Sequence, residues 1–310
     1  MPRHFLRDDD LSPAEQREVL RLALDLRESP YARAPLAGPQ SVALLFDKPT
    51  LRTQTSFSAG VAELGGFPMV VDGRLAQVGE RESVADVTRV LERQVSAIVW
   101  RTFGQERIEE MAAVAQVPVV NALTDQFHPC QILADLLTVA QHRGGLDALA
   151  GQRLAYVGDA ANNMGASYLV GGATAGLHVR VAGPEGYLPD DDVVRRAEEI
   201  AATTGGSVTV TTDATSAVTG ADVVVTDTWV SMGSEASAAR RATDLLPYQV
   251  TPELMDSAAP DAIFLHCLPA YRGKEVAAEV IDGPRSKVWD EAENRRHVQK
   301  AVLTFLLEDR

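Results

Sequence analysis

The chain has 310 residues, a formal net charge of -14, an apolar content of 45% and a charged content of 23%. This composition is that of an ordinary globular protein, and the length suits two domains because single cores rarely grow past about 250 to 300 residues. The acidic balance argues against a nucleic-acid-binding face and against attraction to anionic lipid. Any site for an anion must therefore be built locally, from a few converging cations.

The expected compartment is the cytoplasm. No apolar stretch approaches the roughly 20 residues of a membrane span. The first ten residues, MPRHFLRDDD, are too charged to open a secretory signal. The two cysteines, Cys130 and Cys267, are too few for a disulfide framework and are expected to be free thiols.

The first half of the chain predicts alternating strands and helices. Ser12, Pro13 and Glu15 have the spacing of a capping box and predict a helix start. Short apolar runs then alternate with amphipathic segments, and this alternation favours βαβ units and a parallel sheet. The runs predicted as strands are residues 42–46, 68–71, 97–100 and 117–120.

The second half repeats this alternation after a polar, glycine-rich stretch at 142–145. A final helix is expected over 291–307. The predicted fold class is therefore α/β, with two doubly wound parallel-sheet lobes joined by helices. The strands expected in the second lobe are residues 154–157, 179–182, 207–210, 222–226 and 262–266.

Polar residues follow almost every predicted strand. Ligands of open parallel sheets bind beyond the carboxyl ends of the strands, so these exits are candidate sites. They are residues 48–53, 101–102, 124–131, 158–163, 227–233 and 266–269.

The exit at 50–53 combines hydroxyls, an arginine and the start of a helix. Thr50, Arg52, Thr53 and the free helix amides would suit a phosphate, and a plain helix cap is the alternative. Arg101 closes another buried run, where a guanidinium group favours an anionic ligand or a salt bridge.

His128 precedes a proline at a predicted helix start, with Gln131 in the first turn. A histidine donor there could polarise a carbonyl or stabilise an oxyanion. A metal site with Cys130 and Asp135 is the rival interpretation, but a second pair of ligands at zinc spacing is missing.

The exit at 158–163 invites a dinucleotide-binding interpretation, but two of the three required glycines are replaced. Asn162 and Asn163 better suit a carboxylate or an amide, and an Asx turn is the alternative. Asp227, followed by Ser231, suits a substrate ammonium group.

Taken in this order, the motifs resemble the transcarbamylase family, and in particular its ornithine branch. The match runs nearly from end to end, and the HCLPA and D-x-W-x-SMG motifs are specific to that branch. The matching stretches are HFLRDDDLS at 4–12, FDKPTLRT, QVGERES, HPCQ, DTWVSMG, HCLPAYRGKEV and ENRRHVQKA at 293–301.

The resemblance implies a domain arrangement and an assembly. Residues 1–136 would bind carbamoyl phosphate, with the C-terminal helix 291–310 packing back on them, and residues 137–290 would bind ornithine. The implied assembly is a homotrimer or a multiple of trimers with shared active sites. No metal and no organic cofactor is implied.

The resemblance also implies roles for individual residues. Leu51 stands where the family has a threonine, so only its backbone amide could bind phosphate. Gln77 matches a residue that commonly reaches a neighbouring subunit's site. The residues implied for carbamoyl phosphate are Thr50, Leu51, Arg52, Thr53, Gln77, Arg101, His128, Gln131, Cys267, Leu268 and Arg295, with Arg52, Arg101, His128 and Cys267 in catalytic roles. Those implied for ornithine are Asn162, Asn163, Asp227, Ser231, Met232 and Cys267.

The implied reaction is attack of the ornithine δ-amine on carbamoyl phosphate, giving citrulline and phosphate, in arginine biosynthesis rather than catabolism. Putrescine, acetylornithine and aspartate are rival amines; the Asp227 and Ser231 exit favours a free α-amino group, which putrescine lacks and acetylornithine has blocked. A nucleotide-dependent dehydrogenase and a non-catalytic binding homologue are the alternatives from other classes.

Overall fold

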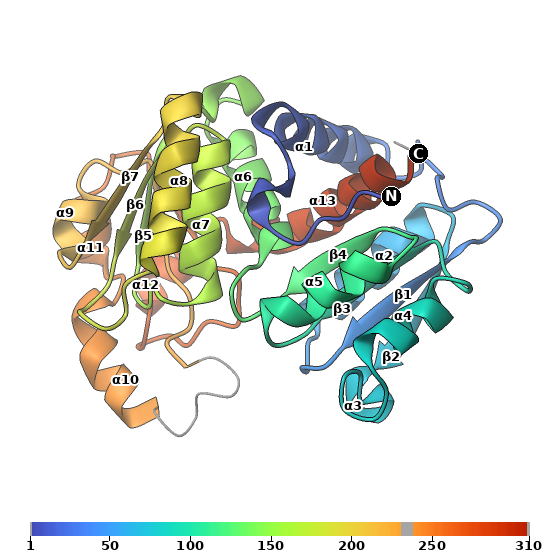
Figure 1. The fold of residues 1–310 in the computed structure, drawn as a ribbon. Helices are drawn as coiled ribbons and strands as arrows, with labels where there is room; N and C mark the ends of the chain where they lie inside the picture. Colours follow the sequence, from blue (N-terminus) through green and yellow to red (C-terminus); the bar gives the residue numbers. More distant parts are fainter. Residues whose placement is uncertain (1, 231–237, 309–310) are drawn as a thin grey trace. The chain divides into compact units, whose positions relative to one another are not determined.

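The computed structural model describes residues 2–230 and 238–308. The chain forms two compact units, the first made of Met1–Leu137 with Glu293–Arg310 and the second of Thr138–Ala292 (Figure 1). Each unit contains one parallel sheet covered by helices. The predicted fold class, two parallel-sheet α/β lobes, is confirmed.

The first unit has a four-stranded sheet in the order β2-β1-β3-β4. Its strands are β1 (Ser41–Phe46), β2 (Phe67–Asp72), β3 (Ala97–Arg101) and β4 (Val119–Leu123). Its helices are α1 (Pro13–Glu28), α2 (Arg52–Glu63), α3 (Gly73–Ala76), α4 (Val84–Leu91) and α5 (Gln105–Val114), together with parts of α6 (Pro129–His142) and α13 (Val288–Glu308).

Local sequence signals explain where these elements begin. The predicted capping box is present: Ser12 Oγ accepts the Glu15 N–H, and the Glu15 carboxylate accepts the Ser12 N–H at 2.8 Å. Strand β4 spans Val119–Leu123, so it begins two residues later and ends three residues later than the predicted strand 117–120.

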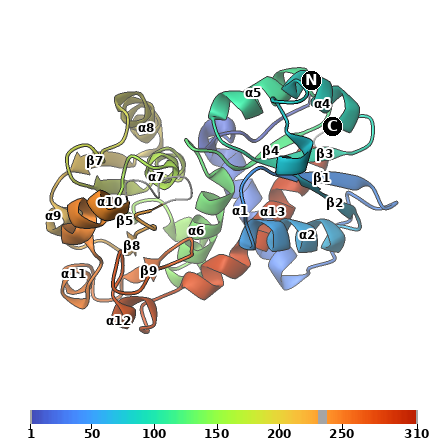
Figure 2. The same ribbon diagram turned by 90° about the horizontal axis from the view of Figure 1, so that it is seen from below.

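The two faces of this sheet are both covered. Alternate residues such as Leu45 and Trp100 pack with Ile108 and Met111 of α5, while α2 packs on the other face. Figure 2 shows α4 and α5 on one side of the strands and α1, α2 and α13 on the other.

The second unit has a five-stranded sheet in the order β7-β6-β5-β8-β9. Its strands are β5 (Arg153–Val157), β6 (His178–Ala182), β7 (Ser207–Thr211), β8 (Val223–Val225) and β9 (Ile263–Leu265). Its helices are α7 (Asn163–Thr174), α8 (Asp191–Thr204), α9 (Ala214–Val218), α10 (Ala238–Leu245), α11 (Pro252–Asp256) and α12 (Ala278–Ile281).

Strand β5 shows how the second sheet is buried on both faces. Ala155 and Val157 join a core with residues of α9, α11 and α12. Tyr156 points the other way and stacks on Tyr168 of α7, with ring centroids 5.5 Å apart. Because consecutive side chains of a strand alternate between faces, this arrangement requires helices on both sides.

None of the helices in the described residues is long and apolar enough to cross a membrane.

Lys300 of α13 anchors that helix within the first unit. Its side chain is fully buried, and its ammonium group donates to the Leu26 carbonyl at 3.1 Å and to Glu63 at 2.6 Å. A third bond, of 3.3 Å, reaches the Pro30 carbonyl. Lys300 therefore joins α13 to the ends of α1 and α2.

Replacing Lys300 with methionine should destabilise the protein by about 3 kcal/mol, because it leaves two carbonyls without this donor and leaves the largely buried Glu63 carboxylate with Arg296 as its remaining ion-pair partner. Chemical unfolding monitored by circular dichroism measures this change. Arg33→Ala, which breaks the exposed Arg33–Glu308 pair, is the control and should cost less than about 1 kcal/mol. Equal effects of the two substitutions would contradict the role given to Lys300.

Candidate functional site

In the first unit, two strand exits meet at one edge of the sheet. Phe46 and Arg101, the last residues of β1 and β3, are register partners, and the Asp47 N–H donates to the Arg101 carbonyl at 2.9 Å. Helix α2 begins at Arg52, and its cap position, Leu51, supplies no side-chain bond. The start of α2 thus follows the end of β1 at this edge, and a helix start favours an anion.

Arg295 brings α13 to this edge. Its guanidinium group donates to Thr53 at 2.6 Å and to the Gln131 side chain at 2.7 Å. Gln131 is held in turn by Asp135, to which it donates at 2.8 Å. The structure therefore joins the starts of α2 and α6 to a helix from the far end of the chain.

His128 lies within the field of three arginines. Burial lowers the pKa of His128 well below its usual value, and the positive charges of Arg295, Arg101 and Arg52 lower it further. The imidazole is consequently neutral at physiological pH. It can donate one hydrogen bond without adding a fourth positive charge.

Arg52 carries a buried donor that a ligand oxygen could accept. Its Nε is a buried donor that has no hydrogen-bond partner among the described residues. A buried guanidinium N–H is costly to leave unpaired, so a ligand oxygen at this position would remove the cost.

Two other residues expected around carbamoyl phosphate lie differently. The Leu51 side chain is 74% exposed, so only its backbone faces the exit. Gln77 has a left-handed backbone with φ of 48°, and within the described ranges no hydrogen bond links its side chain to Arg52, Arg101 or His128. Thr50 Oγ1 accepts the Thr53 N–H at 3.4 Å and so caps the helix start. This bond is compatible with the other interpretation of the hydroxyl, as part of a phosphate site.

Cys130 is a packing residue. Burial raises the pKa of its thiol to about 12, and Sγ contacts the Asn121 carbonyl at 3.5 Å. A thiol of this kind is not a nucleophile at neutral pH.

Asp47 was not expected to have a role. Its carboxylate accepts from the Thr102 hydroxyl at 2.6 Å and from the Trp100 indole at 3.1 Å, and it pairs with Arg107 at 3.4 Å. Arg107 also donates to the Val78 carbonyl at 2.6 Å and so ties down the segment after Gln77. An acidic residue between a buried strand and a proline was the only sequence signal for this network.

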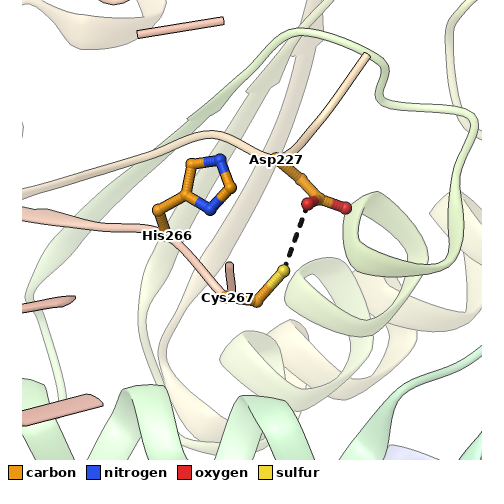
Figure 3. A group of neighbouring side chains, drawn as sticks. All are labelled: Asp227, His266 and Cys267. Carbon is orange, nitrogen blue, oxygen red and sulfur yellow. Dashed lines mark hydrogen bonds between the residues drawn. The ribbon is translucent and has the colours of Figure 1, made fainter. Parts of the chain in front are cut away.

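In the second unit, Asp227 and Cys267 follow β8 and β9 and meet at the edge of the sheet. Cys267 Sγ donates to Asp227 Oδ1 at 3.1 Å (Figure 3). Asn162 approaches the other carboxylate oxygen, with its side-chain amide 3.4 Å from Asp227 Oδ2. Three strand exits of the second sheet thus converge on one carboxylate.

Asn162 is also the N-cap of α7, where its side-chain oxygen accepts the Gly165 N–H at 2.9 Å. Its amide nitrogen donates to the Tyr156 hydroxyl at 3.1 Å. Burial raises the pKa of Tyr156 well above its usual value, and the carboxylates of Asp227 and Asp159 raise it further. The Asn162 side chain therefore caps α7 and is fixed in place.

The remaining predicted residues are placed as follows. Asn163 is the first residue of α7, and Leu268 has a left-handed backbone with φ of 57°. Ser231 and Met232 lie outside the described residues.

Asp227, His266 and Cys267 could also hold a metal ion. Their ligand atoms all lie within 4.8 Å of one another, and they are of the kinds that zinc prefers. However, the thiol and the carboxylate are hydrogen bonded to each other, and the imidazole Nδ1 accepts the Leu268 N–H at 2.9 Å. These bonds account for the arrangement of the three groups without an ion.

The fold and these strand exits define a two-domain parallel α/β protein with polar groups gathered beyond the strands of each sheet. Two family models match the chain. The carbamoyl-P binding domain of aspartate/ornithine carbamoyltransferase matches residues 3–141, and the Asp/Orn binding domain of the same family matches residues 150–306. The chain belongs to the aspartate/ornithine carbamoyltransferase family, which is a family of enzymes.

Individual relatives agree. An ornithine carbamoyltransferase of Bifidobacterium longum subsp. infantis is 63% identical over 304 residues, which is 98% of this chain and 95% of that one. The crystallised ornithine carbamoyltransferase of Pyrococcus furiosus is 41% identical, with a TM-score of 0.94 over 100% of this chain and 98% of that one. The anabolic enzyme of Campylobacter jejuni is 33% identical, with a TM-score of 0.93 over 99% and 100%.

The low pKa of His128 predicts a loss of stability in acid. Below pH 6.5 the unfolded chain binds a proton at this residue that the folded chain does not, so the free energy of unfolding falls as the pH drops through the unfolded pKa. Between pH 7.5 and 5.5, His128→Asn should remove about 1.4 kcal/mol of this loss. Urea unfolding of both proteins at the two pH values measures it.

His297→Asn is the comparison for this experiment, because burial lowers the pKa of His297 to about 4 and gives an effect of the same sign. If wild type and His128→Asn lose the same free energy on acidification, the folded His128 binds a proton and the assignment is wrong.

Proposed function

We propose that the protein is an ornithine carbamoyltransferase. It transfers the carbamoyl group of carbamoyl phosphate to the δ-amine of L-ornithine and releases L-citrulline and phosphate. The observation that carries the proposal is the pairing of Asp227 with Cys267 beside Asn162, on a chain that shares 63% identity with an enzyme of this name.

The first unit supplies the site for carbamoyl phosphate. Arg52 and the first amides of α2, with Thr50 and Thr53, bind the phosphate, because a helix start and a guanidinium fork both favour a multiply charged anion. Arg101 and the neutral imidazole of His128 point to the carbamoyl oxygen. They stabilise the negative charge that develops there when the amine attacks.

The remaining members of that site act on these groups. Arg295 and Gln131 are further polar groups of the proposed carbamoyl phosphate site. Both are held in place by the hydrogen bonds that join α2, α6 and α13. Leu51 contributes only its amide. Gln77 serves a neighbouring subunit's site in the proposed assembly.

The second unit supplies the site for ornithine. Asp227 binds the α-ammonium group of ornithine. Putrescine has no α-amino group, and the α-amino group of acetylornithine is blocked by the acetyl group. Asn163 and Asn162 bind the α-carboxylate, and Ser231 and Met232 complete the holder of the amino group. Cys267, next to Asp227, lines the approach of the δ-amine.

The amine must lose a proton before it can attack. An alkyl amine with a pKa near 10 is almost fully protonated at neutral pH, so the site binds the neutral form or favours deprotonation by desolvation. Attack then forms the new C–N bond, and the C–O bond to phosphate breaks. The departing phosphate accepts the proton that the amine nitrogen releases.

The proposed setting is arginine biosynthesis in the cytoplasm, in a homotrimer or a multiple of trimers. The similarity to an enzyme described as anabolic supports the biosynthetic direction. Light scattering should give three times the mass of one chain, or a multiple of that value. A monomer would contradict the shared site.

A product assay tests the function. The protein is mixed with carbamoyl phosphate and, separately, with ornithine, acetylornithine, putrescine and aspartate, and the carbamoylated product is measured. Ornithine should give citrulline at a rate far above the other three. Absence of citrulline, or a faster reaction with another amine, would overturn the proposed substrate.

Replacing Arg101 with alanine should lower kcat/KM for citrulline formation by about 30-fold to 10³-fold. This range corresponds to about 2 to 4 kcal/mol, the effect of removing one oxyanion donor. Steady-state kinetics with both substrates measures it. Arg195→Ala is the control, because Arg195 forms exposed ion pairs with Asp192 and Glu199 on α8. Unchanged kinetics in Arg101→Ala would remove this residue from the mechanism.

A further inference from the structure

We propose that His266 and Glu275 are positioning residues that hold the Cys267–Leu268 turn and thereby set the contact between Cys267 and Asp227. The inference rests on the proposed function, because it deepens the account of the ornithine site. Neither His266 nor Glu275 has a role in the reaction as described above.

The turn after β9 requires a specific restraint. Leu268 has φ of 57°, a left-handed conformation that is strained for a residue with a side chain. The Leu268 N–H donates to His266 Nδ1 at 2.9 Å. This bond links the residue before Cys267 to the residue after it. The position of the cysteine backbone is therefore set by the imidazole.

Glu275 lies beside that imidazole. Because Nδ1 accepts the Leu268 N–H, the ring proton resides on Nε2, which lies 3.4 Å from Glu275 Oε1 and makes no hydrogen bond among the described residues, so the carboxylate acts on the ring through its charge. Both side chains are completely buried. The Glu275 carboxylate also accepts the Tyr271 N–H. One carboxylate thus holds the loop that follows the turn and attracts the N–H of the imidazole.

The backbone of His266 is also hydrogen bonded. Its N–H donates to the Glu291 carboxylate at 2.8 Å. Figure 3 shows that the thiol of Cys267, and not the imidazole, is hydrogen bonded to Asp227. The imidazole therefore affects Asp227 only through the position of Cys267.

A buried carboxylate facing an imidazole is an expensive way to fill space, since apolar side chains of similar volume often do so at lower cost. The pair gives instead a fixed direction: Glu275 orients His266, His266 fixes Leu268, and the intervening Cys267 places its thiol 3.1 Å from Asp227. This chain of contacts ends at the carboxylate proposed to hold the amino group of ornithine.

The test compares His266→Leu with His266→Asn. Leucine removes the acceptor, whereas the asparagine oxygen can replace Nδ1. In His266→Leu, kcat/KM for ornithine should drop by about 10²-fold, through a higher KM or a lower kcat. This is the effect expected of a misplaced group in the site. KM for carbamoyl phosphate should change by less than about threefold, and His266→Asn should recover most of the loss.

A second readout follows the thiol directly. Cys130 is buried, so iodoacetamide reacts with Cys267 alone among the two cysteines of the chain. Alkylation should be faster in His266→Leu, because the thiol is no longer held by Asp227, and it should return toward the wild-type rate in His266→Asn. A purely structural role would not produce this recovery together with the separation of the two KM values.

Two further variants complete the experiment. Glu275→Gln keeps an acceptor for Tyr271 and changes only the partner of Nε2, so it should raise KM for ornithine about threefold and remain folded if His266→Leu does not. His178→Leu, in β6, removes a histidine that bonds the Ser207 hydroxyl and should change neither readout.

The outcomes separate the inference from the function on which it rests. If wild type makes no citrulline, the proposed function fails, and the alkylation comparison still tests the turn. If wild type makes citrulline while folded His266→Leu and Glu275→Gln keep wild-type KM values and alkylation rates, the positioning role is wrong. Equal loss for both substrates without recovery in His266→Asn would also overturn it.

Discussion

The first unit depends on the two hydrogen bonds that the guanidinium group of Arg295 donates. Its bond to Thr53 joins residues 242 positions apart, and its second bond reaches Gln131. The starts of α2 and α6 are therefore fixed by α13, the last helix in the sequence. Lys300 docks the next turns of the same helix on α1 and α2. Docking of the C-terminal helix is therefore required for the hydrogen bonds at the starts of α2 and α6.

This assembly brings three positive charges near one imidazole in a protein of net charge -14. Burial, together with the positive charges of Arg295, Arg101 and Arg52, lowers the pKa of His128 and keeps the imidazole neutral, and the same three charges favour a nearby anion. A protonated His128 would add to the repulsion and would lose the ability to accept a proton. The local charge is therefore opposite to the charge of the whole protein, as attraction of a small anion requires.

The sequence predicted both sheets because buried parallel strands appear as short apolar runs between amphipathic helices. It also predicted that polar groups would meet, since parallel strands end at one edge of their sheet. Asp47 and Glu275 were missed for a common reason. Each is a buried carboxylate whose partners, such as Arg107 or His266, are apart from it in sequence, and burial of a charge leaves no local pattern. The start of β4 was wrong by two residues because the apolar run begins before the strand and marks no boundary at Val119.

The two units share a parallel-sheet architecture but carry side chains of opposite charge beyond the ends of their strands. In the first, a sheet edge collects guanidinium groups around helix amides, which suits a phosphate. In the second, the equivalent edge collects the Asp227 carboxylate, a thiol and an amide, which suits an ammonium group and a neutral amine. A thiol is a weaker donor than a hydroxyl, so its bond to Asp227 would leave this carboxylate able to accept further hydrogen bonds from the ammonium group of the proposed substrate. A stronger donor at this position would compete with the amino acid for the same carboxylate.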